Sequence, residues 1–528
     1  MKKLVLLAIG AKYVHSTLSV WVLAESVSRY ARVSVETDVV EATIRQSEDE
    51  IAGMVEARNP DIIGISTYVW NAGKLPGLFA LLRERIPGAM LVLGGPEASH
   101  NAAYWLAQGA GHVLSGEGER SLPALLDALF GEPPAPPETE DEWIDPYNER
   151  YLKTLNGRIA YLETSRGCPF RCAFCLSGGS GVRFLPLNEA KERIRKLARS
   201  GAKTVKLVDR TFNCDAARAV ELFQTVIALD TNCRFHFEAA ADLFDQPTLE
   251  LLQTAPPGRI QLEIGLQSYH QPALNAVNRK TDLEKAGKNV MTLLQKGNIH
   301  IHVDLIAGLP YETLAHFQNS FDKAYKLGAH TLQLGFLKLL HGSALRAQAE
   351  ELGIVYNENP PYEIVSSPWL SEEDLQILKQ TENALQHTTN KGRFNRTLDY
   401  ALKVSGLRPF ELFRKLGKAA THHGTALERY AEEIYDCFIN LPGVEAEKLI
   451  ENMVCDWLGM VKGKNTPAFL KRPGIKLEHK TARGETAILP SGRGVYVDGN
   501  DRDPVTGLYK LYFVNSSPSR KMDLPSFR

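Results

Sequence analysis

The chain has 528 residues, 44% of them hydrophobic and 23% charged, and its 61 basic and 62 acidic side chains nearly cancel. This balance excludes a disordered or fibrous chain, and the near-zero net charge provides no overall attraction to nucleic acid or anionic lipid. No run approaches the roughly 18 apolar residues of a membrane span, and the short apolar run after two lysines fits a first strand better than a signal peptide, so we expect a cytoplasmic protein without a membrane span.

The first 130 residues alternate short apolar runs with amphipathic helical patterns. Strands are predicted over 4–9, 33–40, 61–66, 90–95 and 112–119, and helices over 18–30, 47–57, 73–85 and 120–130. This alternation is typical of an α/β fold with a doubly wound, Rossmann-like parallel sheet, in which ligands bind at the carboxyl ends of the strands. The candidate ligand contacts at those ends are Ser66, Thr67, Gly94, Gly95, Pro96, Gly116, Glu117 and Gly118.

Residues 131–142 combine four prolines with five acidic residues, which predicts a stiff, solvated linker that we extend to residue 157. A second alternating region follows, with strands predicted over 159–164, 203–209, 234–239, 259–265, 301–308 and 331–336. These β/α units without a clear seventh or eighth predict an open, partial (β/α)6 barrel over 158–344, with its site at the carboxyl ends of the strands. Residues 345–528 change to helical stretches and a Gly- and Pro-rich end, which predicts a mixed C-terminal domain.

Three of the seven cysteines, Cys168, Cys172 and Cys175, follow the first predicted barrel strand with the spacing Cys-x3-Cys-x2-Cys. Thiolates this close together select a soft metal centre, either zinc or iron–sulfur. Zinc sites normally take four ligands, and the other cysteines are distant in sequence, so we favour a [4Fe–4S] cluster with one iron left open over a structural zinc loop. The remaining four cysteines are expected to be small buried hydrophobes.

This loop, with Phe174 before its last cysteine, resembles the cluster loop of the radical S-adenosylmethionine (SAM) superfamily. The resemblance implies that the three cysteines hold the cluster, that SAM binds its open iron, and that SAM cleavage yields a 5′-deoxyadenosyl radical. Matching strand ends over about 158–340 imply further cofactor contacts from Asp209, Phe212, Glu238, Gln267, Ser268 and Gly308. Arg210 stands where cobalamin-dependent members carry a second Asp.

A doubly wound domain ahead of such a barrel resembles the cobalamin-binding fold, and the glycine-containing strand ends match its segments. The resemblance implies cobalamin as a third cofactor, with its nucleotide tail between these loops and its corrin ring facing the barrel. The motif Asp-x-His-x-x-Gly, whose histidine ligates cobalt in other cobalamin proteins, does not occur. We therefore expect cobalamin without a histidine ligand, and we interpret His15, His100 and His112 as packing or solvent-facing residues.

The order of the three regions resembles a cobalamin-binding radical SAM subgroup that ends in a domain of uncharacterised role. The resemblance implies a methyltransferase acting on an unactivated carbon; the alternative is a cyclisation, oxidation or rearrangement without methyl transfer. A methylthiotransferase is disfavoured because no cysteine precedes Cys168, and a cobalamin-sensing protein because the cysteine triad is present. The implied partners are a one-electron donor such as flavodoxin or ferredoxin and a substrate that can be a small molecule, a peptide or RNA. We interpret the basic strip 462–483 as a solvated face.

Overall fold

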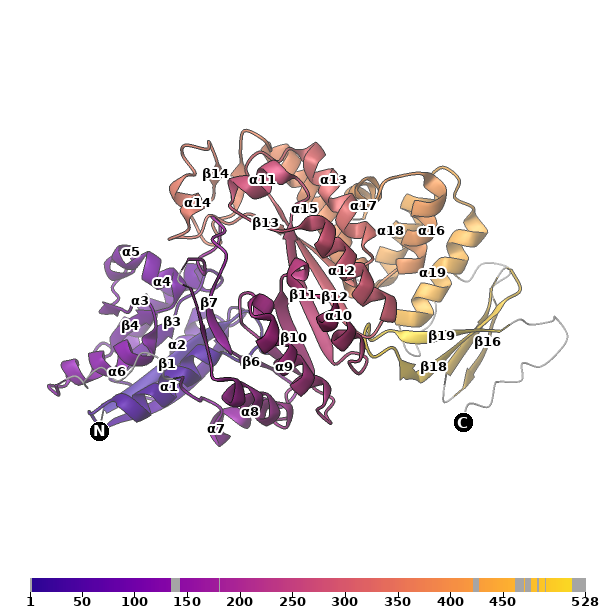
Figure 1. Ribbon diagram of the computed structural model, residues 1–528. Helices are drawn as coiled ribbons and strands as arrows, with labels where there is room; N and C mark the ends of the chain where they lie inside the picture. The colour runs from indigo at the N-terminus through magenta and orange to yellow at the C-terminus, as the bar shows by residue number, and fades with distance from the viewer. Residues whose placement is uncertain are drawn as a thin grey trace.

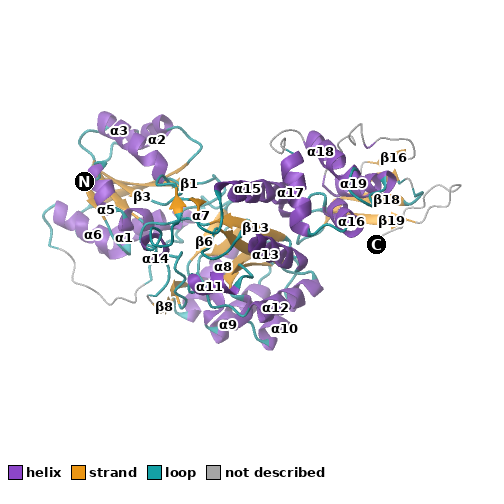
Figure 2. Ribbon diagram, turned by 90° about the horizontal axis from the view of Figure 1, so that it is seen from above, coloured by secondary structure: helices purple, strands orange, loops and turns teal. Residues whose placement is uncertain are grey.

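The computed structural model describes residues 2–133, 143–179, 181–420, 427–460, 470, 476–481, 484–489 and 491–514. Three bodies follow one another in chain order from the N-terminal sheet to the C-terminal helices and small sheet (Figures 1 and 2). The predicted α/β fold class is confirmed, with two parallel sheets followed by mixed C-terminal structure. Most of the basic strip 462–483 and the acidic segment 134–142 lie outside the described residues.

The N-terminal sheet has five parallel strands in the order β2-β1-β3-β4-β5. Alternate residues of β1 enter two separate hydrophobic cores, with Leu4 and Leu6 on one face and Val5 and Leu7 on the other, so both faces need covering helices. Its elements are β1 (Lys2–Gly10), α1 (Leu18–Tyr30), β2 (Val35–Thr43), α2 (Glu48–Glu56), β3 (Ile62–Ser66), η1 (Ala72–Lys74), α3 (Leu75–Arg85), β4 (Met90–Gly94), α4 (Pro96–His100), α5 (Ala102–Ala107), β5 (His112–Val113) and α6 (Gly118–Leu129).

The second sheet has six parallel strands in the order β13-β12-β11-β10-β9-β6. Its edge strands, β6 and β13, do not pair with each other, so the barrel is open as predicted. The strands are β6 (Ile159–Leu162), β9 (Thr204–Leu207), β10 (Arg234–Ala239), β11 (Ile260–Gln267), β12 (His300–Ala307) and β13 (Thr331–Phe336). The helices between them are α8 (Leu187–Ala198), η2 (Phe212–Cys214), α9 (Ala216–Ile227), η3 (Ala241–Leu243), α10 (Gln246–Gln253), α11 (Gln271–Ala276), α12 (Leu283–Lys296) and α13 (Leu314–Lys326).

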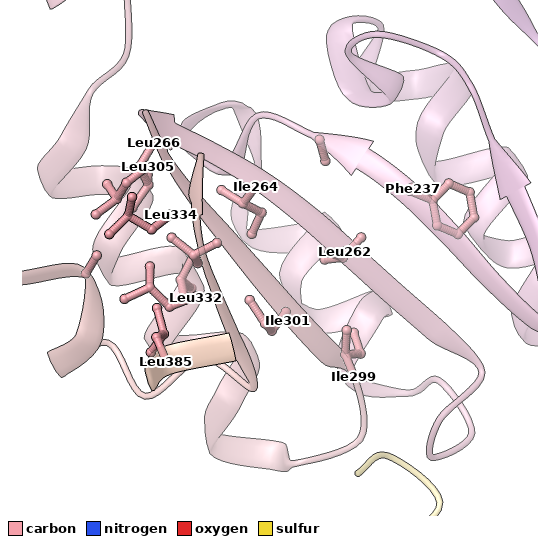
Figure 3. Packing of buried hydrophobic residues seen from close by; sticks show 14 of the residues in the cluster. Phe237, Leu262, Ile264, Leu266, Ile299, Ile301, Leu305, Leu332, Leu334 and Leu385 are labelled. Carbon is pink, nitrogen blue, oxygen red and sulfur yellow. The ribbon is translucent and has the colours of Figure 1, made fainter. Parts of the chain in front are cut away.

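The two faces of the barrel sheet differ in chemistry. On one face, residues such as Leu262, Ile264, Ile301 and Leu305 are fully buried with their neighbours in one hydrophobic cluster (Figure 3). The alternate residues form what we call the polar face: Tyr161, Lys206, His236, Glu238, Glu263, His302 and Asp304. Buried parallel strands are usually apolar on both faces, so we take this charged face as a candidate binding site.

Residues 143–157 differ from the predicted solvated linker. Tyr147, Tyr151 and Leu155 are fully buried, and they join the core that continues into the barrel. The segment includes α7 (Glu149–Leu152), whose N-cap is Asn148. Aromatic side chains within this stretch supply apolar area that outweighs its polar composition.

The C-terminal part begins near the N-terminal domain, at residues 344–356, and then runs along the barrel to the opposite end of the molecule, where its last helices and small sheet lie (Figure 1). The sequence predicted two strands at its end, whereas the structure has a four-stranded antiparallel sheet of β16 to β19. Its elements are α14 (Ala344–Ala347), β14 (Val355–Tyr356), β15 (Ile364–Ser366), α15 (Glu372–His387), η4 (Thr389–Lys391), α16 (Asn395–Ser405), α17 (Pro409–Ala419), α18 (Leu427–Ile439), α19 (Ala446–Met460), β16 (Lys476–Thr481), β17 (Gly484–Ile488), β18 (Gly494–Arg502) and β19 (Tyr509–Val514). Within the described ranges, no helix is both long enough and apolar enough to span a membrane.

Candidate active site

The cysteine loop begins in a short hairpin that the sequence did not predict. Strands β7 (Ser165–Cys168) and β8 (Gly181–Phe184) pair antiparallel just after β6, with Cys168 at the end of the first strand. The loop is anchored at Ala173, whose N–H donates to the Val277 carbonyl at 2.9 Å and whose carbonyl accepts from Leu345 N–H at 2.8 Å. Backbone contacts from two distant segments therefore hold the middle of the loop at the carboxyl end of the barrel.

The three thiols are neighbours, and their chemistry fits an iron–sulfur cluster. Burial raises the pKa of Cys172, the nearby Cys175 and Cys168 raise it further, and the Arg279 guanidinium, 3.9 Å from its sulfur, opposes them. A bound metal centre would neutralise thiolates held on one loop, so the arrangement fits such a centre. In the part of the chain that the structure describes, no three metal-binding side chains are already assembled around one point. The loop thus brings the thiols together without a finished coordination shell.

Asp209 and Phe212 are buried behind this loop. The Asp209 carboxylate accepts from Thr164 N–H at 3.1 Å and from Thr164 Oγ1 at 2.7 Å, and it also accepts from the Ser165 hydroxyl. Phe212 packs against Phe223 and Phe237 with ring centroids 5.1 and 4.5 Å apart. These contacts fix the junction from which the cysteine hairpin starts, while the predicted cofactor contacts of both residues stay predictions.

The polar face carries a charged network at the centre of the barrel sheet. Lys206 Nζ lies 3.2 Å from Glu238 Oε1 and 3.1 Å from Glu263 Oε2, and His236 Nε2 lies 2.8 Å from the same Glu263 oxygen. Burial alone would raise the pKa of Glu263, but His236 and Lys206 outweigh it and hold the pKa at about 2. Glu238 pairs with Lys206 in the same network, and its predicted contact with SAM stays a prediction.

The residues at the ends of β11 and β12 divide into two groups. Gln267 has a left-handed conformation at a β-bulge, and its buried side-chain oxygen has no hydrogen-bond partner. This oxygen could accept a hydrogen bond from a ligand hydroxyl. Ser268 instead donates its hydroxyl at 2.5 Å to Glu312, a fully buried carboxyl whose pKa burial raises to about 7. Gly308 has a φ of +98°, and a Cβ there would lie 3.0 Å from Ile364. The absence of a side chain therefore lets the C-terminal segment pack closely here, and the predicted cofactor contact stays a prediction.

The predicted cobalamin contacts lie along one edge of the N-terminal sheet. A Cβ added at Gly94 or Gly116 would meet no atom within 4 Å, which leaves space for a ligand to approach the backbone. The Ser66 hydroxyl is buried without a partner at the same edge, which also fits a ligand. The residues present therefore fit a bulky group at this position.

Other residues of that edge serve the protein itself. Gly95 has a φ of +99°, and its Cβ would lie 2.6 Å from the carbonyl oxygen of the fully buried Thr67. Pro96 opens α4, and a Cβ at Gly118 would lie 2.7 Å from Leu23. These three positions are explained by local packing, and their cofactor contacts stay predictions.

The main feature missed from the sequence is an ion-pair network around Arg166, which joins the two cofactor domains. The Arg166 guanidinium pairs with Glu163 at 2.8 Å, with Glu117 at 2.6 Å and with Glu119, and Arg183 pairs with Glu117 as well. Glu117 and Glu119 lie at the start of α6, whereas Arg166 lies on β7, two residues before Cys168. Burial raises the pKa of Glu163 to about 7, and Arg166 opposes this. Glu117, predicted to contact cobalamin, pairs here with Arg166 and Arg183 of the cysteine hairpin, and its cofactor contact stays a prediction.

A second unpredicted contact joins the C-terminal segment to the N-terminal sheet. The Tyr362 hydroxyl donates to the Glu97 carboxylate, and Asn101 lies 3.2 Å from His341. Burial raises the pKa of Glu97, and the hydrogen bond from Tyr362 opposes it. The sequence showed these polar residues but contained no local signal that they would meet.

A doubly wound sheet whose ligand edge contacts a three-cysteine loop on an open β/α barrel defines the class of cobalamin-binding radical SAM proteins. Comparisons with family models agree: the B12 binding domain matches residues 4–126, the Radical SAM superfamily matches 162–324, and a model described as a protein of unknown function (DUF4080) matches 350–490. The chain is a cobalamin-binding radical SAM protein with an additional C-terminal domain, and the expected cofactors are cobalamin, SAM and a [4Fe–4S] cluster.

Similar proteins include methyltransferases and a cyclase. The chain is 24% identical over 314 residues to 2-(S-pantetheinyl)-carbapenam-3-carboxylate methyltransferase of Streptantibioticus cattleyicolor, with 52% of this chain and 46% of that protein covered. It is 23% identical over 340 residues to the anaerobic magnesium-protoporphyrin IX monomethyl ester cyclase of Rubrivivax gelatinosus, with 56% and 60% covered. The chain therefore spans about half the length of these curated relatives.

Solved structures share the fold. The radical SAM methyltransferase TsrM from Kitasatospora setae has a TM-score of 0.54 at 18% identity, covering 69% of this chain and 80% of that chain. The cobalamin-dependent SAM radical enzyme OxsB has a TM-score of 0.59 at 14% identity, covering 87% and 78%. At these identities, the likeness supports the arrangement of the domains and not the reaction.

Proposed function

We propose that this chain is a cobalamin-dependent radical SAM methyltransferase that acts on an unactivated carbon. The observation that carries the proposal is the Arg166 network, because it fixes the ligand edge of the N-terminal sheet against the cysteine hairpin. When bound, the cofactors would supply a methyl group on one side and a hydrogen-abstracting radical on the other. Transfer between two such groups requires that their sites face each other at a fixed separation.

The residues have distinct tasks in this proposal. Cys168, Cys172 and Cys175 hold the cluster, and the unpartnered Gln267 oxygen accepts a hydrogen bond from the SAM ribose. Gly94 and Gly116 admit the cobalamin tail, since their backbones face open space. The polar face orients the substrate, and the hydrophobic side of the barrel sheet keeps that face in position. The division of the chain at about residues 130, 157 and 344 belongs to the same proposal, and each matched family range lies within one of the resulting domains.

A reaction without methyl transfer is the second candidate, because the chain is also similar to a cyclase. Both reactions use the same cofactor sites and need a one-electron donor such as flavodoxin or ferredoxin. They differ in whether the product gains a methylene unit. The identity of the modified molecule in that measurement also gives the substrate class.

The test is an anaerobic reaction of the full chain with reconstituted cluster and cobalamin, methyl-deuterated SAM, a flavodoxin reducing system and a small-molecule extract from a strain lacking the gene. Mass spectrometry should find one extract component that gains a deuterated methyl group. The variant with all three cluster cysteines changed to Ala serves as the control and should give no such product. A product that forms without added label would refute methyl transfer and favour the second candidate.

A further inference from the structure

Two loops that hold none of the predicted cofactor contacts carry cations without an acidic partner among the described residues. One loop joins β1 to α1 and contains Lys12, and the other joins α15 to α16 and contains Lys391 and Arg393. Across the described ranges, none of these three side chains forms an ion pair. Exposed cations of proteins are usually solvated by water, so these three form a binding site only if they lie close to one another.

The first loop is fixed on the edge of the barrel. The Val14 carbonyl accepts from Ile159 N–H at 2.8 Å, so the loop adds to strand β6. Arg158 reinforces the contact by donating to the Tyr13 carbonyl at 2.9 Å, and its charge is balanced by Glu41 at 2.8 Å. Lys12 is exposed on this anchored loop, and no such acid balances its charge.

The second loop is fixed on the opposite edge. The Asn390 side chain bonds both the N–H and the carbonyl of Leu332 in β13, at 2.9 and 2.8 Å. Phe394 has a φ of +58° and is buried against Tyr430, and a left-handed conformation is uncommon for an aromatic residue. The loop is therefore held by its packing, with Lys391 and Arg393 beside the start of β13.

Because β6 and β13 are the two unpaired edges of the open barrel, the loops flank its open side. Their charges repel one another: burial lowers the pKa of Lys391, and Arg393 and Lys12 lower it further. Lys12 also acts on His15, which lies next to the polar face. Burial lowers the pKa of His15, and the charges of Lys12 and Lys206 lower it further. His15 Nδ1 lies 2.7 Å from the Tyr161 hydroxyl, which links the loop to the polar face. An anion placed among such cations relieves their repulsion.

We propose that Lys12, Lys391 and Arg393 bind an anionic group of the substrate, a carboxylate or a phosphate, at the open edge of the barrel. This inference rests on the proposed function, because it takes the molecule that reaches the polar face to be the substrate. The three cations come from the N-terminal and C-terminal domains, so an anionic substrate would bind only where the three regions meet. The additional C-terminal domain thereby takes part in substrate recognition.

The test measures anion binding by the full chain with reconstituted cluster and cobalamin, using isothermal titration calorimetry at low ionic strength. Pyrophosphate is the phosphate probe and citrate the carboxylate probe. The variant Lys12→Gln/Lys391→Gln/Arg393→Gln is compared with a control, Arg195→Gln/Lys288→Gln/Lys403→Gln, which removes the same charge from exposed residues on α8, α12 and α16. Cobalamin per chain and cleavage of SAM under reducing conditions are measured on each protein.

We expect the native chain to bind one of the two probes at a single site, and the better probe identifies the anion. The first variant should weaken this binding by about tenfold or more, and the control should not. Absence of binding to the native chain, or equal loss in the control, would overturn the proposal. Loss of cobalamin in the first variant would also overturn it, since the cations would then hold the cofactor. Failure of SAM cleavage in all proteins would refute the proposed function and leave the binding result intact.

Discussion

Arg166 is the residue whose removal should loosen the contact between the N-terminal sheet and the cysteine hairpin. Its side chain is 23% exposed and contacts Glu119, which is 17% exposed, Glu163, which is 26% exposed, and Glu117, which is 51% exposed. Changing Arg166 to Ala leaves the two less exposed carboxylates close together without a cation. Breaking a fully buried pair costs about 3–5 kcal/mol and an exposed pair at most about 1 kcal/mol, so we expect a loss of about 2–4 kcal/mol here.

Arg85 provides a matched control. Its side chain is 26% exposed and also contacts two carboxylates, Asp49 and Glu56, but these are 71% and 50% exposed and lie in the same domain. Arg85→Ala should therefore cost less than about 1 kcal/mol. The comparison separates the loss of an arginine from the loss of a contact between domains.

Hydrogen exchange of backbone amides reports the effect locally, which suits a chain of several domains. Peptides covering 163–170 and 114–120 should both exchange faster in Arg166→Ala, by about 30- to 1000-fold for a loss of 2–4 kcal/mol. Neither peptide should change in Arg85→Ala. Unchanged exchange in the first variant, or faster exchange in the hairpin peptide alone, would refute the idea that Arg166 couples the domains.

Three further predictions concern individual sites. Changing all three cluster cysteines to Ala should abolish iron binding and 5′-deoxyadenosine formation, whereas Cys437→Ala should leave both intact by iron analysis and chromatography. Gly94→Val should lower cobalamin per chain without unfolding the domain, because its Cβ enters open space, whereas Gly95→Val should unfold it by clashing with Thr67; full cobalamin in the Gly94 variant would contradict this. The pKa of Glu312 rises from 4.5 to about 7 on folding, so the folded state holds the proton more tightly and this carboxyl should lower the free energy of unfolding by about 3 kcal/mol as pH rises through that window. Glu312→Gln should remove this part of the pH dependence of urea unfolding, and an unchanged dependence would refute the assignment.

The elements and the cofactor class were predictable because their signals are local. The pattern over residues 301–308 predicted a strand, and β12 occupies His300–Ala307 with alternating burial. The spacing of the three cysteines predicted a shared metal centre because neighbouring thiolates on one loop can reach the same ion. The four-residue strands of the β7–β8 hairpin were missed because such short segments carry no detectable periodicity.

Which polar groups meet was decided only by the tertiary structure. Arg166 and Glu119 are 47 residues apart, and Glu97 and Tyr362 are 265 residues apart, and both pairs form because the chain path returns to the same edge. The sequence predicted a cofactor contact for Ser268 but gave no sign that its hydroxyl would donate to Glu312, 44 residues away. A sequence shows through its periodicity which residues are buried, because burial follows from local hydrophobic pattern. It does not show which charges pair, because a charge interacts with whatever the folded chain brings within a few ångströms of it.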